Sequence, residues 1–269
     1  MVLGEILHNR ILESLIAVIG VQVLAAIAVI SLHRSEAWLR RALPYVISIA
    51  VGVLLATGTV HLLPEAIESL GNRGAVWLTL VITMLALYSF ERLFHIVSGV
   101  SAEPASDAED AHARGHHHHH ASKPATLLLG SVTHSLVDGT GVAAAFAIDA
   151  RVGWVTALAV GLHEIPHRLG DFALLVHMGL TRGRAALLAI GAGGSSLLGW
   201  AVVIWLGDSG SHRVAWLLPV SAGSFLYISL VDLLPELQHE RRPMAVVGQI
   251  LCLAVGIALA LGLTRIPGA

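Results

Sequence analysis

The chain has few charged residues and almost no capacity for covalent cross-linking. Charged side chains make up 13% of its 269 residues, and hydrophobic side chains make up 55%. An ordinary soluble domain carries about 25% charged residues, so this balance sets the chain apart from that class. The single cysteine, Cys252, excludes an internal disulfide. The net charge of -2 gives no indication of a nucleic-acid partner.

Long apolar runs take the place of the missing charge. Runs of close to 20 residues recur along the chain, which predicts an all-α polytopic membrane protein embedded in a lipid bilayer. Lysine is nearly absent, and this bias is typical of a GC-rich bacterial gene, so the predicted location is a bacterial inner membrane. Eight transmembrane helices are predicted, at Ile6–Leu32, Leu43–Leu63, Ala75–Ile96, Ala125–Ile148, Val152–Met178, Arg184–Leu206, Val214–Leu237 and Ala245–Leu263.

The basic residues predict the orientation of these helices. The loops after the first, third, fifth and seventh helices, with their flanks, hold ten of the sixteen Arg and Lys residues. The positive-inside rule places these loops in the cytoplasm, so both termini are predicted to be extracytoplasmic. We therefore divide the chain into helices 1–3 at 1–97, a cytoplasmic loop at 98–124, helices 4–5 at 125–178 and helices 6–8 at 179–269.

One short motif occurs twice. Leu-Leu-Pro-Glu ends the second predicted helix at 62–65 and the seventh at 233–236. In the predicted orientation these two ends lie on opposite sides of the membrane. The repeat indicates that helices 1–3 and 6–8 are inverted copies around helices 4 and 5, a 3+2+3 arrangement that many secondary transporters share.

Helices 4 and 5 carry metal-binding side chains at helical spacing. His134 and Asp138 are four residues apart, as are His163 and His167, so each pair lies on one helix face. Two such facing helices would form a cage of three imidazoles and one or more carboxylates, a ligand set suited to Zn(II) or a similar transition metal. Ser135 is a weaker candidate ligand, because a serine in a membrane helix often bonds its own backbone.

Helix 5 carries further ionisable residues on the same face. An ionisable group in the membrane costs roughly 2.5–3.5 kcal/mol, so each should face a partner or a water-filled path. Pro166 is expected to break the backbone bonding beside the ligands. Gly139, Gly141 and Gly170 are expected to let helices 4 and 5 approach closely. The additional ionisable residues are Glu164, Arg168, Asp171 and His177.

With these motifs, HSLVDG at 134–139 and HEIPHRLGD at 163–171, the chain resembles the ZIP (Zrt/Irt-like) family of divalent-metal transporters. GTVHLLPEA at 58–66 and AGSFLYISLVDLLPE at 222–236 extend the resemblance over nearly the whole chain. The resemblance implies transport of zinc toward the cytoplasm, elevator-like movement between helix groups and a homodimer. It also implies a primary site of His134, Asp138, His163 and His167, with Glu164 between that site and a second one. Cadmium, iron, manganese and cobalt suit the same donors.

The chain departs from the family pattern at two positions. Ser135 stands where the family often has asparagine, and Arg168 stands where it often has glutamate. A guanidinium does not bind metal and keeps its charge. Our hypothesis is that Arg168 modulates the second site by replacing its cation and pairs with Glu164 and Asp171. The alternative is that Arg168 points to the boundary between membrane and solvent.

The same residues predict a path for the metal. Glu65 and Glu68 form the predicted entrance, and Asp171 and His177 the predicted exit. Beyond the exit, five consecutive histidines in the cytoplasmic loop are predicted to capture metal, at His116, His117, His118, His119 and His120.

Two other functions fit parts of the sequence. His163-Glu164-Ile165-Pro166-His167 matches the HExxH zinc signature of a metalloprotease, with Glu164 as general base. Pro166 inside the motif and the extra ligand from helix 4 argue against catalysis, which needs an open metal position. A metal sensor that signals through the cytoplasmic loop without transport is the other alternative. The chain is therefore predicted not to be an enzyme.

Overall fold

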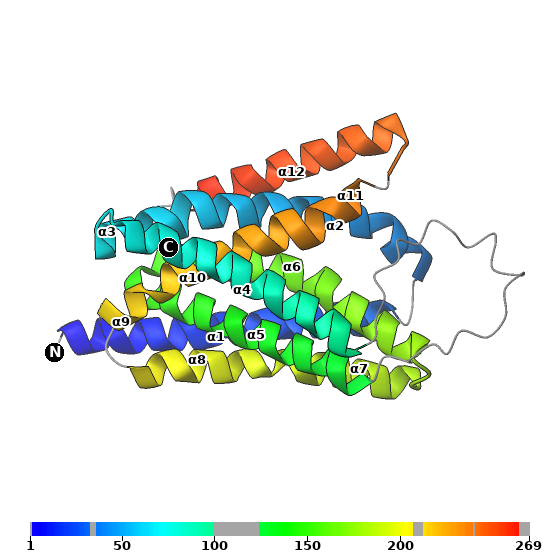
Figure 1. Ribbon diagram of the computed structural model, residues 1–269, viewed down its shortest axis with the longest axis horizontal. Coiled ribbons are helices and arrows are strands. Elements are labelled where there is room, and N and C mark those ends of the chain that lie inside the picture. Colours follow the sequence, from blue (N-terminus) through cyan, green and yellow to red (C-terminus); the bar gives the residue numbers. More distant parts are fainter. Residues whose placement is uncertain (1, 33–35, 99–123, 207–211, 239, 264–269) are drawn as a thin grey trace, which may run out of the picture.

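A computed structural model describes residues 2–32, 36–98, 124–206, 212–238 and 240–263 of the chain. Within these ranges it contains helices and turns and no strand, which confirms the all-α class (Figure 1). The helices are α1 (Val2–Leu32), α2 (Glu36–Ala56), η1 (Thr57–Leu62), α3 (Leu63–Leu70), α4 (Gly74–Ser98), α5 (Pro124–Ile148), α6 (Ala150–His177), α7 (Arg182–Gly193), α8 (Ser195–Leu206), α9 (His212–Ala215), α10 (Leu217–Tyr227), η2 (Ile228–Leu233), α11 (Leu234–Leu237) and α12 (Pro243–Leu263).

Six helical segments in the described ranges are long and apolar enough to cross a membrane, judged by length and composition. They are 9–31, 41–70, 74–93, 182–206, 213–237 and 243–262. Helices α5 and α6 have the length but are not among the six, and they are the helices that carry the predicted metal ligands. The chain is therefore a multi-pass membrane protein, and the count of eight crossings stays a prediction.

The helices form one bundle along a common direction (Figure 1). Helix α12 lies along one edge on α2, and α7 and α8 lie along the opposite edge. Between these edges, α5 packs against both α6 and α8, α1 packs on α6, and α4 packs on α10. Helices α5 and α6 are thus surrounded by other helices.

Glycines allow a close contact between α5 and α8, whereas the sequence predicted that they would bring α5 and α6 together. A Cβ atom on Gly139 of α5 would lie 1.9 Å from the Ser196 carbonyl oxygen of α8, and one on Gly199 of α8 would lie 2.0 Å from the Leu136 carbonyl oxygen of α5. Gly141 faces Ser221 of α10, and Gly170 has nothing within 4 Å. The expectation that these glycines bring helices 4 and 5 together was therefore wrong; Gly139 serves the contact between α5 and α8.

Both copies of Leu-Leu-Pro-Glu occupy the same local structure. In each copy the first leucine is the last residue of a six-residue π-helical turn, η1 or η2, and the proline lies in the first turn of the next α-helix. The helix runs on through each proline, which has no N–H to donate, and the turn before it has the i to i−5 bonding of a π-helix, as from the Leu63 N–H to the Gly58 carbonyl. Helices α3 and α11 lie at opposite ends of the bundle (Figure 1).

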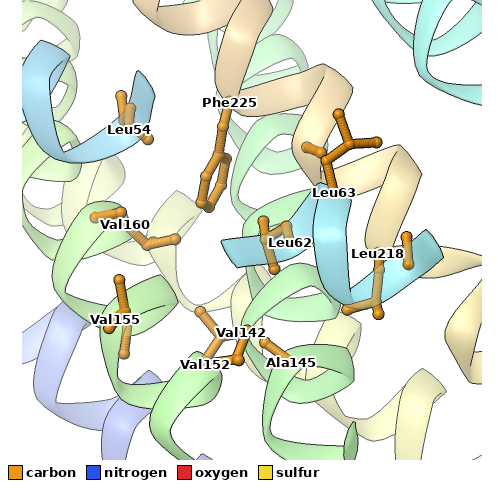
Figure 2. Packing of buried hydrophobic residues seen from close by; sticks show 14 of the residues in the cluster. Leu54, Leu62, Leu63, Val142, Ala145, Val152, Val155, Val160, Leu218 and Phe225 are labelled. Carbon is orange, nitrogen blue, oxygen red and sulfur yellow. The ribbon is translucent and has the colours of Figure 1, made fainter. Parts of the chain in front are cut away.

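The main hydrophobic core lies toward the α3 end. It includes Leu62, Val142, Val155, Leu218 and Phe225, which come from η1, α5, α6 and α10 (Figure 2). All five side chains are buried, whereas large apolar residues on the outer helix faces, such as Leu187 and Trp205, are exposed. An apolar outer face is what a bilayer environment requires.

Candidate metal site

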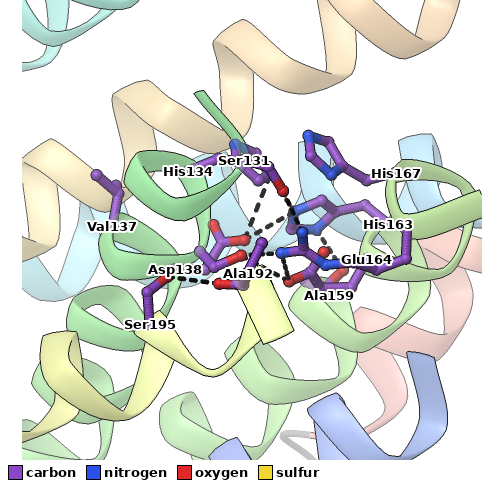
Figure 3. A network of polar contacts seen from close by, with 12 residues as sticks. Ser131, His134, Val137, Asp138, Ala159, His163, Glu164, His167, Ala192 and Ser195 are labelled. Carbon is purple, nitrogen blue, oxygen red and sulfur yellow. Dashed lines mark hydrogen bonds and ion pairs between the residues drawn. The ribbon is translucent and has the colours of Figure 1, made fainter. Parts of the chain in front are cut away.

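Three side chains from α5 and α6 converge at the centre of the bundle. His134 and Asp138 lie one turn apart on α5, and His163 faces them from α6 (Figure 3). Asp138 Oδ2 lies 3.1 Å from His163 Nε2 and 3.4 Å from His134 Nε2, and the two Nε2 atoms are 3.3 Å apart. One ligand atom from each residue lies within 4.8 Å of the others.

The hydrogen bonding of His163 shows why this cluster favours a cation. His163 Nδ1 lies 3.1 Å from the Ala159 carbonyl oxygen, which only accepts hydrogen bonds, so Nδ1 carries the proton. In the neutral ring Nε2 then presents a lone pair toward the Asp138 carboxylate. Asp138 Oδ1 is also buried and has no hydrogen-bond partner among the described residues. A metal ion among these atoms would satisfy all of them.

His167, the fourth predicted ligand, lies beside the three rather than among them. Its ring stacks on that of His134, with centroids 4.3 Å apart and planes 7° apart. Its Nδ1 lies 3.5 Å from Asp171 Oδ2. Three of the four predicted primary ligands therefore converge in the structure, and the fourth lies one ring away.

Arg168 and Glu164 form a second polar group next to the cluster of His134, Asp138 and His163. The Arg168 guanidinium is 1% exposed and lies 2.8 Å from Glu164 Oε1 and 3.0 Å from Asp171 Oδ2. It also donates to the hydroxyls of Ser131 and Ser135. The predicted ion pairs with Glu164 and Asp171 are confirmed, and the alternative that Arg168 points to the membrane boundary is wrong.

Ser135 belongs to this second group. Its hydroxyl donates to Glu164 Oε1 over 3.1 Å while it accepts from Arg168. Gln22 of α1 approaches the same glutamate oxygen at 3.4 Å. Glu164 Oε2, by contrast, is buried and has no hydrogen-bond partner among the described residues. One oxygen of Glu164 is thus held in place, and the other is free to bind an ion.

Two cavities reach the site from the same end of the bundle. One of about 880 Å³ is lined by His163, His167 and Asp171 and continues to His177, Arg182 and Glu236. A smaller one of about 250 Å³ is lined by His134, His167, Asp171 and Asp232. The predicted exit residues Asp171 and His177 therefore lie on the wall of the larger cavity.

A family model described as ZIP Zinc transporter matches residues 9–264, nearly the whole chain. The chain belongs to the ZIP zinc transporter family. It is similar to zinc transporter ZIP13 of Homo sapiens, at 31% identity over 84% of this chain and 71% of that protein. ZIP13 of Gallus gallus is 30% identical over 84% of this chain and 75% of that protein. Zinc transporter ZIP4 of Homo sapiens is 42% identical over 45% of this chain and 18% of that protein.

Membership of the ZIP family confirms the resemblance recognised in the motifs of helices 4 and 5. The relatives' names describe zinc transporters and give no support to a protease or a sensor.

Sequence reasoning missed three residues of the site. Ser131 lies one turn before Ser135, so the helical spacing that indicated the other ligands also places it on this face. Gln22 was an isolated amide in the first apolar run, which was a usable signal. Glu91 of α4 accepts a hydrogen bond from Tyr227 of α10 and lines the smaller cavity. An acidic residue near the end of an apolar run gave no indication of that partner.

The predicted entrance residues lie far from the cavities. Glu65 and Glu68 are in α3, at the end of the bundle opposite α11 (Figure 1). The hydrophobic core that includes Leu62, Leu218 and Phe225 also contains residues of α3, and at its other end Phe225 faces His163 of the metal site, with ring centroids 6.3 Å apart. The five histidines at 116–120 lie outside the described residues.

Proposed function

We propose that this ZIP protein moves zinc across the membrane into the cytoplasm through a site between α5 and α6. The observation that carries the proposal is the meeting of the buried Asp138 and His163 with the partly buried His134, in a chain whose relatives are named zinc transporters. Zinc prefers four nitrogen, oxygen or sulfur ligands in tetrahedral geometry. We propose His167 or Glu164 Oε2 as the fourth ligand. Cadmium, iron(II), manganese and cobalt suit the same donors.

The proposed architecture has eight crossings, with α5 and α6 as the central pair of a 3+2+3 inverted repeat. The packing supports this symmetry. The inverted repeat pairs α1 with α8, α2 with α10, α4 with α12 and α5 with α6. Under this pairing the contact of α2 with α12 corresponds to that of α10 with α4. Under the same pairing the contact of α1 with α6 corresponds to that of α8 with α5. The paired π-helical turns at opposite ends of the bundle fit the same operation.

The proposed direction follows from the cavities and the basic residues. The larger cavity opens at the end where α6 finishes and α7 begins with Arg182, which the positive-inside rule assigns to the cytoplasm. The first residues of α1 and the last of α12 lie at the other end of the bundle (Figure 1), in keeping with extracytoplasmic termini. Metal would leave past Asp171 and His177, and the histidines at 116–120 would capture it.

The proposed cycle needs a second arrangement of the helices. In the structure, apolar side chains fill the way from Glu65 and Glu68 to the site. An elevator-like shift of α5 and α6 against α2 and α10 would open that way and close the cavities. We further propose a homodimer in a bacterial inner membrane as the working form.

Zinc influx into proteoliposomes tests the proposal. Asp138→Asn keeps the size of the side chain but removes a charged ligand, so zinc influx should fall by at least about tenfold. Glu240→Gln changes an acidic residue that pairs with the exposed Arg242, and it should leave influx unchanged. Wild-type protein that binds zinc without influx would refute transport and return the sensor to consideration.

A further inference from the structure

The Arg168 guanidinium is a buried cation beside the candidate metal site. It is 1% exposed, and both of its terminal nitrogens are hydrogen-bonded, to Glu164 and Ser135 on one side and to Asp171 and Ser131 on the other. A charge at this depth is tolerated when it is paired with opposite charges and hydrogen-bonded. Two carboxylates beside the metal ligands are therefore paired with a cation that belongs to the protein itself.

The charges around the site have a simple balance. Asp138, Glu164 and Asp171 are three buried carboxylates, and Arg168 is the one guanidinium bonded to them. Their formal net charge is minus two, which one divalent ion cancels. A second divalent ion would leave an excess of two positive charges in a region of low dielectric, where such an excess is costly.

The oxygens that remain free also match one ion. Arg168 occupies Glu164 Oε1 and Asp171 Oδ2. Asp138 Oδ1 and Glu164 Oε2 are the carboxylate oxygens that are buried without a hydrogen bond in the described part of the chain. Both belong to residues beside the His134 and His163 imidazoles. A second ion, in contrast, would have to displace the guanidinium from its two carboxylates.

We infer that Arg168 is a tethered counter-cation that limits the site between α5 and α6 to one divalent ion. This inference rests on the proposed function, because it takes the cluster of His134, Asp138 and His163 to be the metal site. It goes beyond that function by fixing how many ions the protein carries in each loading. The guanidinium takes the place of a second ion that would otherwise be needed for neutrality.

The test counts zinc ions per chain at saturation. The protein is purified in nanodiscs with His116–His120 all changed to alanine, so that the histidine tract adds no metal. After excess zinc is removed, metal analysis should give close to one ion per chain in this background and close to two after Arg168→Glu. That substitution changes the net charge of the site to minus four, which two ions cancel. Arg242→Glu reverses a charge that is 82% exposed and should leave the count at one.

A second pair of variants keeps the inference falsifiable if Arg168→Glu does not fold. Asp171→Asn alone lowers the site charge to minus one, so zinc affinity should fall by about tenfold or more. Adding Arg168→Gln returns the charge to minus two and should recover most of that affinity. If the guanidinium served only to hold the helices together, the double variant would instead be weaker than Asp171→Asn alone, which would overturn the inference.

The results for this inference and for transport are separable. Two tightly bound ions in the parent protein, or one ion in a folded Arg168→Glu variant, would overturn the one-ion site even if zinc influx is normal. Failure of the parent protein to bind or move zinc would overturn the proposed function together with the inference.

Discussion

The two halves of the bundle are built from the same helices but differ in what lies between them. On the α3 side of the metal site, Leu62, Val142, Leu218 and Phe225 close the space between η1, α5 and α10. On the α11 side, residues of α5, α6 and η2 border both cavities, which are lined by histidines and carboxylates. The difference shows that the site communicates with one end of the bundle only.

Chemical labelling should show the largest difference between the two halves of the bundle. In a Cys252→Ser background, Gly170→Cys places a thiol on the wall of the larger cavity, and Val142→Cys places one in the packed half. A membrane-impermeant thiol reagent should label position 170 more than about 100-fold faster, because position 142 reacts only after the packed half opens. The rates are measured in vesicles with the cytoplasmic end of the protein outward. Equal rates would show that the packed half does not close the metal site on the α3 side.

Removing a side chain from the packed half should cost folding stability. Leu218 is fully buried in the core, so Leu218→Ala should lower the free energy of unfolding by about 2–5 kcal/mol. Leu187 of α7 is 72% exposed, and Leu187→Ala should change it by about 0.5 kcal/mol or less. Denaturant titration in detergent measures both. A Leu218→Ala variant as stable as Leu187→Ala would show that the apolar half is loosely packed.

The contact between α5 and α8 gives a prediction of smaller size. A methyl group on Gly139 meets the Ser196 carbonyl, so Gly139→Ala should destabilise the fold by about 1–3 kcal/mol. Gly191 of α7 has nothing within 4 Å, and Gly191→Ala is the matched control, expected to be neutral or slightly stabilising. Thermal unfolding compares the two. The account of close helix approach fails if both variants melt together.

The affinity of the metal site for zinc should also depend on pH. Imidazoles bind metal only when neutral, so protonation competes with zinc and affinity falls as pH falls. Zinc binding to the His134 and His163 imidazoles should therefore be weaker at pH 6.5 than at pH 7.5. Isothermal titration calorimetry measures the affinity at both values. A binding constant that does not change over this range would exclude histidine as the dominant ligand.

Much of this account was available from the sequence because membrane proteins show strong local patterns. Apolar runs gave the helical segments, and the spacing of His134 with Asp138 gave one face of the site. The paired charges of Arg168 also followed from spacing, since i+3 and i+4 neighbours share a face. These properties all depend on a single helix or on one pair of neighbouring turns.

Properties that depend on how distant helices pack were not available. The partner of Gly139 is α8 rather than α6, and no periodicity in α5 distinguishes those neighbours. The stacking of His167 on His134, which moves it out of the converging cluster, depends on the relative rotation of α5 and α6. The bond from Tyr227 to Glu91 joins residues 136 positions apart.

X-ray absorption at the zinc edge tests the central claim most directly. The sample is the purified protein with His116–His120 changed to alanine and with zinc bound. Our account predicts two or three imidazole nitrogens and carboxylate oxygen around the metal at about 2.0–2.2 Å. It also predicts that the imidazole signal decreases in a His163→Gln variant at equal zinc occupancy. A shell of oxygen alone, or a spectrum that His163→Gln leaves unchanged, would contradict a site built between α5 and α6.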